Sequence, residues 1–338
     1  MELAMPVVWS DQCRLHEPGG EIFVGVRTPG TEVAARLDAI LAALDDARFV
    51  PAEPHDDEVL LAVHDAALLN YLENAWLEWE ASELEQDRVV PYVFAHEALG
   101  VRAVPTAVWA RPGYFAYDTM TLIGPGTWEA ARAAVDAALT AVDLVLAGEP
   151  AAYACCRPPG HHATRRAHGG SCYLNNAAVA AKAFGRYVAV VDVDAHHGNG
   201  TQEIFWDDAD VLVGSVHVDP AAGWFPHFLG FADETAEAAN RNLVLPPGAG
   251  DEPWLAAVRE LADWVCDASA LVVSLGVDAA ADDPESPLRV SAAGFREAGR
   301  ILGALGLPTV LVQEGGYHLP TLGPLVRETL LGFEEGRP

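Results

Sequence analysis

Residues 190–200 read VVDVDAHHGNG, an apolar strand that ends in two carboxylates and two histidines. Ligands of an open parallel sheet bind beyond the carboxyl ends of its strands, which makes this strand end a candidate site. If the extended geometry continues, the side chains of Asp192, Asp194 and His196 share one face. Carboxylate oxygens and imidazole nitrogens are ligands that zinc accepts. A capping aspartate and a structural histidine would explain the segment equally well, so its interpretation depends on the other strand ends.

The rest of the chain alternates apolar runs with helical periodicity. Runs rich in apolar and β-branched residues predict buried strands at 151–156, 187–193, 210–218, 270–277 and 308–313. Helical patterns predict helices at 31–46, 66–83, 127–147, 176–184, 254–268 and 292–305. This alternation indicates an α/β fold with a mostly parallel sheet and helices on both faces. Residues 85–126 show no clear period, and we expect them to form a long loop excursion from a single domain spanning 1–338.

Composition limits the class of protein. Hydrophobic residues make up 51% of the 338 residues, which suits one large domain. The start of the chain does not read as a signal peptide, and no apolar run reaches the roughly 18 residues of a membrane span. The 5 cysteines are too scattered for a disulfide framework and fit reduced thiols. We therefore expect a cytoplasmic protein without a membrane partner.

Charge excludes one further class of partner. The formal net charge is −29, and Lys182 is the sole lysine. Nucleic acid is not an expected partner, because phosphate contacts need a basic face. Two interpretations of the acidic charge stay open: a solvated surface that reflects the genome or salt adaptation, or a field that attracts cationic substrates. The second needs acidic groups near the mouth of the site, because salt screens such a field beyond roughly 8–10 Å.

A second strand end supplies a further carboxylate. The run 270–277 is apolar until Asp278, which would project from the same edge of the sheet. With Asp194 and His196 it makes three protein ligands and leaves a position for water and substrate, as a catalytic zinc site requires. Zinc and ferrous iron both suit this ligand set, so the metal used in the cell stays open.

Two more strand ends carry residues suited to proton transfer and to polarising a carbonyl. His161 and His162 follow the turn 158–160, which reads PPG, and paired histidines suit acid–base chemistry near neutral pH. Tyr317 follows 314–316, which reads EGG, and its hydroxyl could donate to a substrate carbonyl oxygen. Taken singly, each of these residues could be structural; together they predict a hydrolytic site.

These segments together resemble the histone deacetylase family. The matching pieces are 157–162, 169–176, 192–202, 275–284 and 314–317, in that order. Within the family the chain is most similar to the bacterial acetylpolyamine amidohydrolases. That similarity runs from the strand at 5–10 to the C-terminal helix and includes 125–128 and 225–230. The resemblance implies a three-layer arginase-like α/β fold and a zinc-dependent deacetylase.

The resemblance assigns roles residue by residue. The implied zinc ligands are Asp194, His196 and Asp278. The implied catalytic residues are His161 and His162 as the histidine pair, Tyr317 as the tyrosine that polarises the carbonyl, and Asp192 and Asn199 as partners of the first and second histidine. Some relatives have an aspartate at the Asn199 position, so the amide should support His162 less strongly. We expect His162 to act as general base and then as acid, beside a more cationic His161. A structural potassium ion is implied at Asp192, Asp194, His196, Ser215 and Val216.

The same comparison implies a set of substrate contacts. The implied residues are Gly170, Ser171, Phe225, Glu285 and Trp109. Phe225 matches one aromatic wall of a tunnel, whereas Ser171 stands where the other aromatic is found and predicts a wider, more polar side. Glu285 matches a glutamate that recognises a distant ammonium in polyamine-selective relatives, and its alternative is a solvated loop acid. Trp109 stands near the mouth and could hold a cation on its ring face, with dimer packing as its alternative.

We therefore predict a zinc-dependent amidohydrolase that removes acetyl or similar short acyl groups from acetylated polyamines or related small amines. The alternative is a protein acetyl-lysine deacetylase. The complete residue set disfavours a binding protein without turnover, and a ureohydrolase of the related fold would need a two-metal site with more ligands than we find. The resemblance also implies a homodimer built by residues 85–126 across the site entrance, which would exclude folded protein substrates.

Overall fold

One parallel sheet runs through the molecule. The computed structural model describes residues 3–101 and 103–338. Within them, eight strands follow the order β4-β1-β5-β10-β9-β6-β7-β8, and all neighbouring pairs are parallel. The bounds are β1 Pro6–Trp9, β4 Arg48–Pro51, β5 Ala151–Ala154, β6 Val188–Asp192, β7 Val211–Val218, β8 Asn240–Leu245, β9 Ala270–Leu275 and β10 Thr309–Gln313. A separate antiparallel hairpin pairs β2 (Glu21–Phe23) with β3 (Val26–Thr28).

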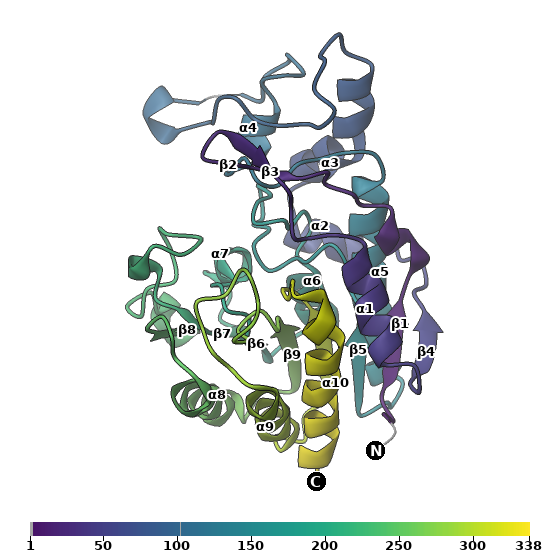
Figure 1. Ribbon diagram of the computed structural model, residues 1–338, viewed down its shortest axis with the longest axis vertical. Helices are drawn as coiled ribbons and strands as arrows, with labels where there is room; N and C mark the ends of the chain where they lie inside the picture. The colour runs from purple at the N-terminus through teal and green to yellow at the C-terminus, as the bar shows by residue number, and fades with distance from the viewer. Residues whose placement is uncertain (1–2, 102) are drawn as a thin grey trace.

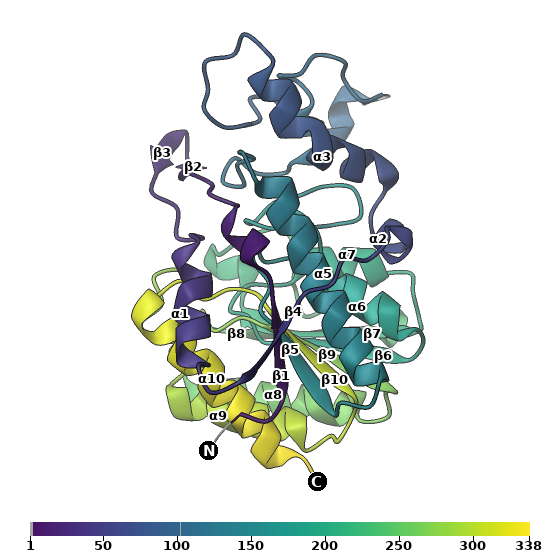
Figure 2. The ribbon, with the colours of Figure 1, turned by 90° about the vertical axis from the view of Figure 1, so that its right-hand side faces the viewer.

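Helices cover both faces of this sheet (Figures 1 and 2). One face carries α1 (Ala35–Ala43), α8 (Asp251–Val265), α9 (Ala292–Gly303) and α10 (Leu319–Gly336). The other carries α2 (Glu58–Val63), α5 (Thr127–Leu146), α6 (Asn176–Phe184) and α7 (Asn199–Phe205). At the end of the molecule opposite the two termini stand α3 (Ala66–Glu80) and α4 (Pro112–Phe115) (Figure 1). Short 3-10 turns form at η1 (Asp11–Arg14), η2 (Glu97–Leu99), η3 (Pro220–Ala222) and η4 (Ala236–Ala238).

The apolar runs of the sequence form the centre of the sheet. All five predicted strands are present, with ends that differ by one or two residues. The edge strands β4 and β8 were not predicted. In β8, which reads NRNLVL, polar residues interrupt the apolar run. Asn240 and Asn242 are nevertheless buried, because their side-chain amides donate to Gln202 Oε1 at 2.8 and 2.9 Å. The strand and the terminal helix that the resemblance implied are β1 and α10.

The six predicted helices are also present; α6 has the predicted bounds, and the other five end one to three residues before the predicted end. α1 is shorter than the predicted 31–46. α8 begins three residues earlier than predicted, at Asp251, because its first turn holds Asp251, Glu252 and Pro253. Acidic side chains complement the free N–H groups of a first turn, and proline is tolerated there because its missing N–H would have no partner in the helix. No helix in the described ranges is both long and apolar enough to cross a membrane.

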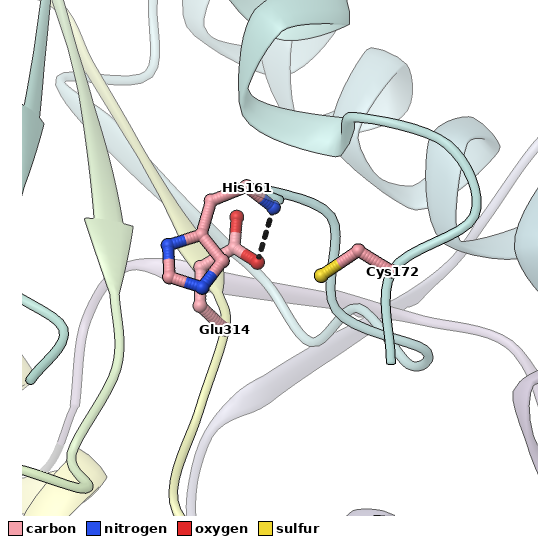
Figure 3. Close-up of side chains that lie close together, drawn as sticks. All are labelled: His161, Cys172 and Glu314. Carbon is pink, nitrogen blue, oxygen red and sulfur yellow. Dashed lines mark hydrogen bonds between the residues drawn. The ribbon is translucent and has the colours of Figure 1, made fainter. Parts of the chain in front are cut away.

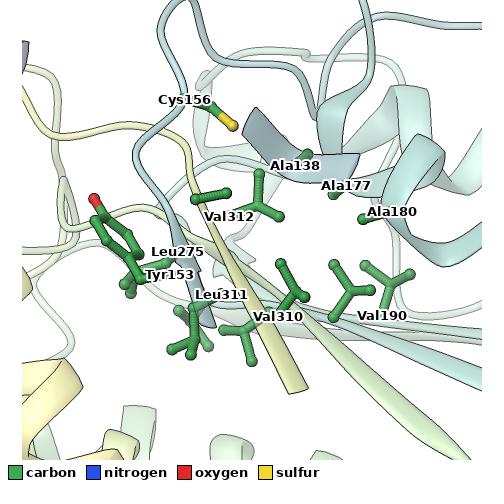
Figure 4. Close-up of a cluster of buried hydrophobic side chains, with 14 of the residues drawn as sticks. Ala138, Tyr153, Cys156, Ala177, Ala180, Val190, Leu275, Val310, Leu311 and Val312 are labelled. Atoms are coloured by element: carbon green, nitrogen blue, oxygen red, sulfur yellow. The ribbon is translucent and has the colours of Figure 1, made fainter. Parts of the chain in front are cut away.

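Small side chains set how closely the layers pack. Figure 4 shows Val190, Val310 and Val312 of the sheet beside Ala138 of α5 and Ala177 of α6. All of these side chains are fully buried. On the other face α9 and α10 pack backbone to backbone: a Cβ at Gly332 would lie 1.9 Å from the carbonyl oxygen of Arg296. The helices therefore hold the sheet between two tightly packed layers.

Strand order places the candidate site. Because all strands of the sheet are parallel, their carboxyl ends lie along one edge. The last strand of the chain, β10, lies between β5 and β9, so Val312 pairs with both Ala154 and Ser274. β9 in turn pairs with β6. The loops that follow β5, β10, β9 and β6 are therefore neighbours, although they are far apart in the sequence.

Candidate active site

The three predicted metal ligands come together beyond β6 and β9. One ligand atom each of Asp194, His196 and Asp278 lies within 4.8 Å of the other two. The His196 Nδ1 is 2.9 Å from Asp278 Oδ2 and 3.3 Å from Asp194 Oδ1. The two aspartates are buried and the histidine is partly buried. The cluster opens on the pocket described below, because His196 lines that pocket.

The extended geometry expected for this segment does not continue past the strand. β6 ends at Asp192, and a tight turn follows. Carboxylates hold this turn: Asp192 Oδ1 accepts the N–H of Asp194 at 3.1 Å, and Asp278 Oδ1 accepts the N–H of Ala195 at 2.8 Å. Gly276, directly after β9, has to lack a side chain, because a Cβ there would lie 1.9 Å from Asp194 Oδ2. Asp194 and His196 therefore come together because hydrogen bonds bend the chain after β6, and not because alternate side chains of an extended strand share a face.

The charges of this cluster favour a cation. Burial alone would lower the pKa of His196, but the hydrogen bonds to Asp194 and Asp278 raise it well above its usual value. Two carboxylates thus face one imidazole in a region that excludes most water. This donor set fits zinc, with room for water and substrate in the remaining positions. Asp194, His196 and Asp278 therefore form a group that could hold a metal ion.

The histidine pair lies on the turn after β5. His161 Nδ1 is 2.9 Å from Asp192 Oδ2, and His162 Nδ1 is 2.8 Å from Asn199 Oδ1. The two rings lie 4.0 Å apart. Burial alone would lower the pKa of His161, but the charges of Asp194 and Asp192 raise it to about 10. Burial and then the positive charges of His161 and His196 lower the pKa of His162 well below its usual value. The two histidines therefore favour opposite protonation states.

The orientation of Asn199 fixes the free nitrogen of His162. The Asn199 amide nitrogen lies 3.4 Å from the Tyr117 hydroxyl, which itself donates to the backbone oxygen of His162 at 2.9 Å. The Asn199 Oδ1 therefore acts as an acceptor, and the His162 Nδ1 carries the proton that it receives. The His162 Nε2 is left as the nitrogen that can accept a proton.

Tyr317 is held from its backbone and from its ring. Its N–H donates to Asp283 Oδ2 at 2.6 Å, and the Arg36 guanidinium lies 4.8 Å from its ring centre. Arg36 also donates to the carbonyl oxygens of Gly316 at 2.7 Å and Glu314 at 2.5 Å. Burial holds the pKa of Tyr317 well above its usual value, so its hydroxyl keeps the proton that makes it a donor.

One pocket contains seven of the predicted site residues. The predicted residues that line it are His162, His196, Tyr317, Gly170, Ser171, Phe225 and Glu285. The Phe225 ring stands 4.8 Å from the His162 ring as one wall. Trp109 lies on the excursion and is 51% exposed; it is not among the described residues that line the pocket. The structure therefore does not place Trp109 at the site within a single chain.

Three lining residues were not predicted: Glu21, Thr31 and Met120. The Thr31 hydroxyl donates to Glu285 Oε1 at 3.0 Å and fixes that carboxylate. Burial and then the charge of Glu285 raise the pKa of Glu21 to about 7. The pocket therefore brings two carboxylates close enough to repel each other. The β2–β3 hairpin that carries Glu21 has no strong period in the sequence, so nothing there pointed to the site.

The excursion itself supports the pocket. Asp118 Oδ2 accepts the N–H of Gly170 at 2.6 Å, and the Thr121 hydroxyl accepts the N–H of Ser171 at 2.9 Å. The Tyr117 ring lies 6.2 Å from the Phe225 ring, nearly parallel to it. Sequence reasoning missed these residues because 85–126 shows no period that assigns them to an element.

The predicted potassium residues lie at and just after the end of β6 and inside the adjacent strand β7. The register of β6 and β7 sets Asp192 opposite Ser215, and Val216 follows directly. The N–H of Val218 donates to the carbonyl oxygen of Ala195 at 3.0 Å, which draws the turn after β6 against β7.

Similarity to known proteins extends over nearly the whole chain. The family model for the histone deacetylase domain matches residues 30–332. The chain is 39% identical to acetylpolyamine amidohydrolase 1 of Pseudomonas aeruginosa, over 97% of this chain and 98% of that protein. It is 39% identical to the acetylpolyamine amidohydrolase of Mycoplana ramosa, over 97% and 99%. A crystal structure of acetylpolyamine aminohydrolase from Burkholderia pseudomallei matches with a TM-score of 0.93 at 38% identity, covering 99% of this chain and 100% of that one. The predicted fold class is confirmed.

The donor cluster makes a prediction about metal binding that needs no activity assay. Zinc added to chelator-treated protein should raise the midpoint of thermal unfolding by roughly 5 °C or more, because a ligand at about 1,000 times its Kd stabilises by about 4 kcal/mol. Asp278→Asn should lose most of this shift, since the amide cannot supply a charged ligand. Differential scanning fluorimetry measures both.

The matched control is Asp282→Asn, which removes a half-exposed carboxylate four residues away, outside the cluster. It should keep the full zinc shift. An equal shift in Asp278→Asn and wild type would show that zinc binds elsewhere.

Proposed function

The chain belongs to the histone deacetylase family, and on that premise we propose that it is a zinc-dependent deacetylase whose substrates are acetylated polyamines or related small amines. One observation carries the proposal about substrate. The pocket that contains His162 and Tyr317 also contains Glu21 and Glu285, a pair of carboxylates suited to a cationic amine. The near full-length relatives named acetylpolyamine amidohydrolases support it.

The roles that we propose follow from the geometry. Asp194, His196 and Asp278 hold the metal, which when bound supplies an electrophile for the acetyl carbonyl and lowers the pKa of water. His162, neutral and with a free Nε2, takes the proton of the attacking water and later gives it to the leaving amine. His161 stays cationic beside Asp192 and stabilises the charge that develops. Opposite pKa shifts in two neighbouring groups support this division of roles.

The remaining contacts orient the acetyl amide. Tyr317 keeps its proton and donates to the carbonyl oxygen, a contact whose loss typically costs about 2.7–4 kcal/mol. Phe225 packs along the amine side of the substrate. Ser171, with Gly170 before it, forms the opposite side, and we propose that this side is wider and more polar than an aromatic wall.

The acidic pair distinguishes a small diamine or polyamine from a neutral substrate. An ammonium at Glu21 and Glu285 relieves their mutual repulsion, so a cation gains more there than beside a single carboxylate. A protein acetyl-lysine deacetylase, the alternative, needs no second ammonium at this position. The pocket therefore favours an amine that carries a further positive charge.

Steady-state kinetics of zinc-loaded protein on two matched substrates tests the substrate class. An acetylated polyamine should have a kcat/KM about tenfold or more above that of an acetyl-lysine peptide, because only the polyamine places a second ammonium at the acidic pair. His162→Ala should lower kcat for both substrates by roughly 100-fold to 10,000-fold, since it removes the proton-transfer group. A preference for the peptide would support the protein deacetylase instead.

The acidic pair itself is tested by charge removal. Glu285→Gln and Glu21→Gln should each raise KM for an acetylated diamine by roughly tenfold, because each removes a hydrogen bond to a charged group. Both should leave kcat/KM for N-butylacetamide, which lacks the second amine, nearly unchanged.

Because the pKa of Glu21 is raised to about 7, its charge forms as pH rises through that value. KM for the diamine should therefore fall as pH rises over the same range. In Glu21→Gln, KM should change less with pH.

Glu58→Gln is the control for net charge, because Glu58 is exposed on α2, outside the pocket. It should change neither constant. A rise in KM for N-butylacetamide equal to that for the diamine would show that the carboxylates shape the pocket and do not bind the amine.

We also propose that residues 85–126 form a homodimer interface near the site entrance. Large apolar side chains are exposed along this excursion: Tyr92, Val93, Phe94, Leu99, Val101, Val104 and Trp109. Such a concentration of exposed apolar groups is typical of an interaction surface. Trp109, outside the pocket of one chain, would then pack against the partner.

The potassium site at residues 192–216 and the cytoplasmic location stay predictions.

Sedimentation velocity at micromolar concentration should give a dimer, because the exposed apolar surface is covered by self-association. Leu99→Glu should shift the equilibrium towards monomer by placing a charge in the interface. Leu146→Glu, a change at an exposed leucine of α5 outside the excursion, should leave the dimer intact. A clean monomer of the wild type would contradict the proposal.

A further inference from the structure

Glu314 is a buried carboxylate to which the roles above give no part. It follows β10 and is fully buried. Its Oε2 accepts the N–H of Gly160 at 2.6 Å and the N–H of His161 at 3.1 Å. Figure 3 shows the carboxylate between the His161 ring and the thiol of Cys172. We propose that Glu314 is a positioning residue that holds the backbone of the histidine turn in place; the inference rests on the proposed deacetylase function.

The turn needs this acceptor. The two prolines before Gly160 have no N–H, so the next two N–H groups are those of Gly160 and His161. Both are buried, and both point to the same oxygen of Glu314. The carbonyl groups of the turn are held separately: the His161 oxygen accepts the N–H groups of Gly200 and Thr201 at 3.0 and 3.1 Å. Without Glu314, two buried donors would lose their acceptor, and the turn would have to move to find another.

The same strand end is tied to the rest of the site. The N–H of Gly315 donates to Asp194 Oδ2 at 2.9 Å, and Arg36 holds the Glu314 carbonyl oxygen. Residues 314–317 therefore contact the metal ligands by their backbone and the histidine turn by the side chain of Glu314. Through this segment the position of the His162 Nε2 is set relative to Tyr317. A displacement of about 1 Å at reacting groups can cost roughly 100-fold in rate.

Substitutions that change the length of the Glu314 side chain and those that change its charge should have different effects. Its second oxygen, Oε1, has no hydrogen-bond partner among the described residues. One acceptor oxygen at the correct distance is therefore enough for positioning. Glutamine keeps that length and an acceptor oxygen but has no charge. Aspartate keeps the charge but is one methylene shorter and cannot reach both N–H groups from the same backbone position.

Kinetics of the zinc-loaded full chain on an acetylated diamine separate the two roles. Glu314→Gln should keep kcat within about fivefold of the wild type. Glu314→Asp and Glu314→Ala should lower kcat by roughly 100-fold, while KM for the diamine changes by less than about threefold. Zinc content, measured by atomic absorption, should be the same in all variants, because the metal ligands are unchanged.

Glu334→Ala is the matched control. Glu334, near the end of α10, also uses one oxygen, Oε1, to accept two successive backbone N–H groups, those of Ala4 at 2.8 Å and Met5 at 2.6 Å. These partners directly precede β1, so the contact lies at the amino ends of the strands, away from the site. Its loss should leave kcat unchanged. If Glu314→Ala does not fold, the comparison of Glu314→Gln with Glu314→Asp decides the question.

Three results would overturn the inference: an active Glu314→Asp with an inactive Glu314→Gln, a rise in KM that accounts for the lost activity, or a loss of zinc in step with kcat. A wild type that hydrolyses no acetylated amine would instead overturn the proposed substrate. The positioning role would then be decided by whether the turn at 158–162 is displaced in a crystal structure of Glu314→Asp.

Discussion

Buried carboxylates that accept backbone N–H groups hold this site together. Asp192 and Asp278 fix the turn after β6, and Asp283 fixes the backbone of Tyr317. Asp118, which is half-buried, fixes Gly170 in the same way. A carboxylate removed from water must find donors, and the free N–H groups of loops must find acceptors. Each carboxylate thereby gains hydrogen-bond donors, and each loop N–H group gains an acceptor. Loops that would otherwise be mobile are held at fixed positions along the edge of the sheet.

The same burial gives the site its electrostatic asymmetry. His161 and His162 are adjacent in the sequence and their rings are in contact, yet one partner is an aspartate and the other an amide. A low-dielectric surrounding amplifies that difference, because charges there are screened less than in water. Desolvation alone would make both rings neutral. The carboxylates near His161 select which of the two keeps its proton.

The sequence was sufficient to predict the central strands, and several of the candidate-site residues that it predicted lie at or just after the ends of those strands. Apolar runs marked β5, β6, β7, β9 and β10, and polar residues directly after several of them marked the site. The extended geometry expected at Asp194 and His196 was wrong, because hydrogen bonds from side chain to backbone turn the chain after Asp192. The spacing of apolar residues in the sequence does not reveal hydrogen bonds of this kind.

Residues that act from outside the strand ends were harder to predict. Glu21 lies on a three-residue strand, and Asp118 lies in a segment without a period, so neither has a local signal. Arg36 lies in α1 two residues before Asp38, with no local pattern that sets it apart, and its role depends on contacts nearly 280 positions away along the chain. Only the topology brings these groups to the pocket.

The position of β10 also governs how the protein can be made. Its residues, Thr309–Gln313, come late in the chain, but its place in the sheet is central, between β5 and β9. During synthesis the earlier strands can form only two separate blocks, β4-β1-β5 and β9-β6-β7-β8, each with an unpaired inner edge. Such edges can pair with other chains until they are covered. A nascent chain therefore carries an aggregation risk at the centre of its future core until translation has passed residue 313.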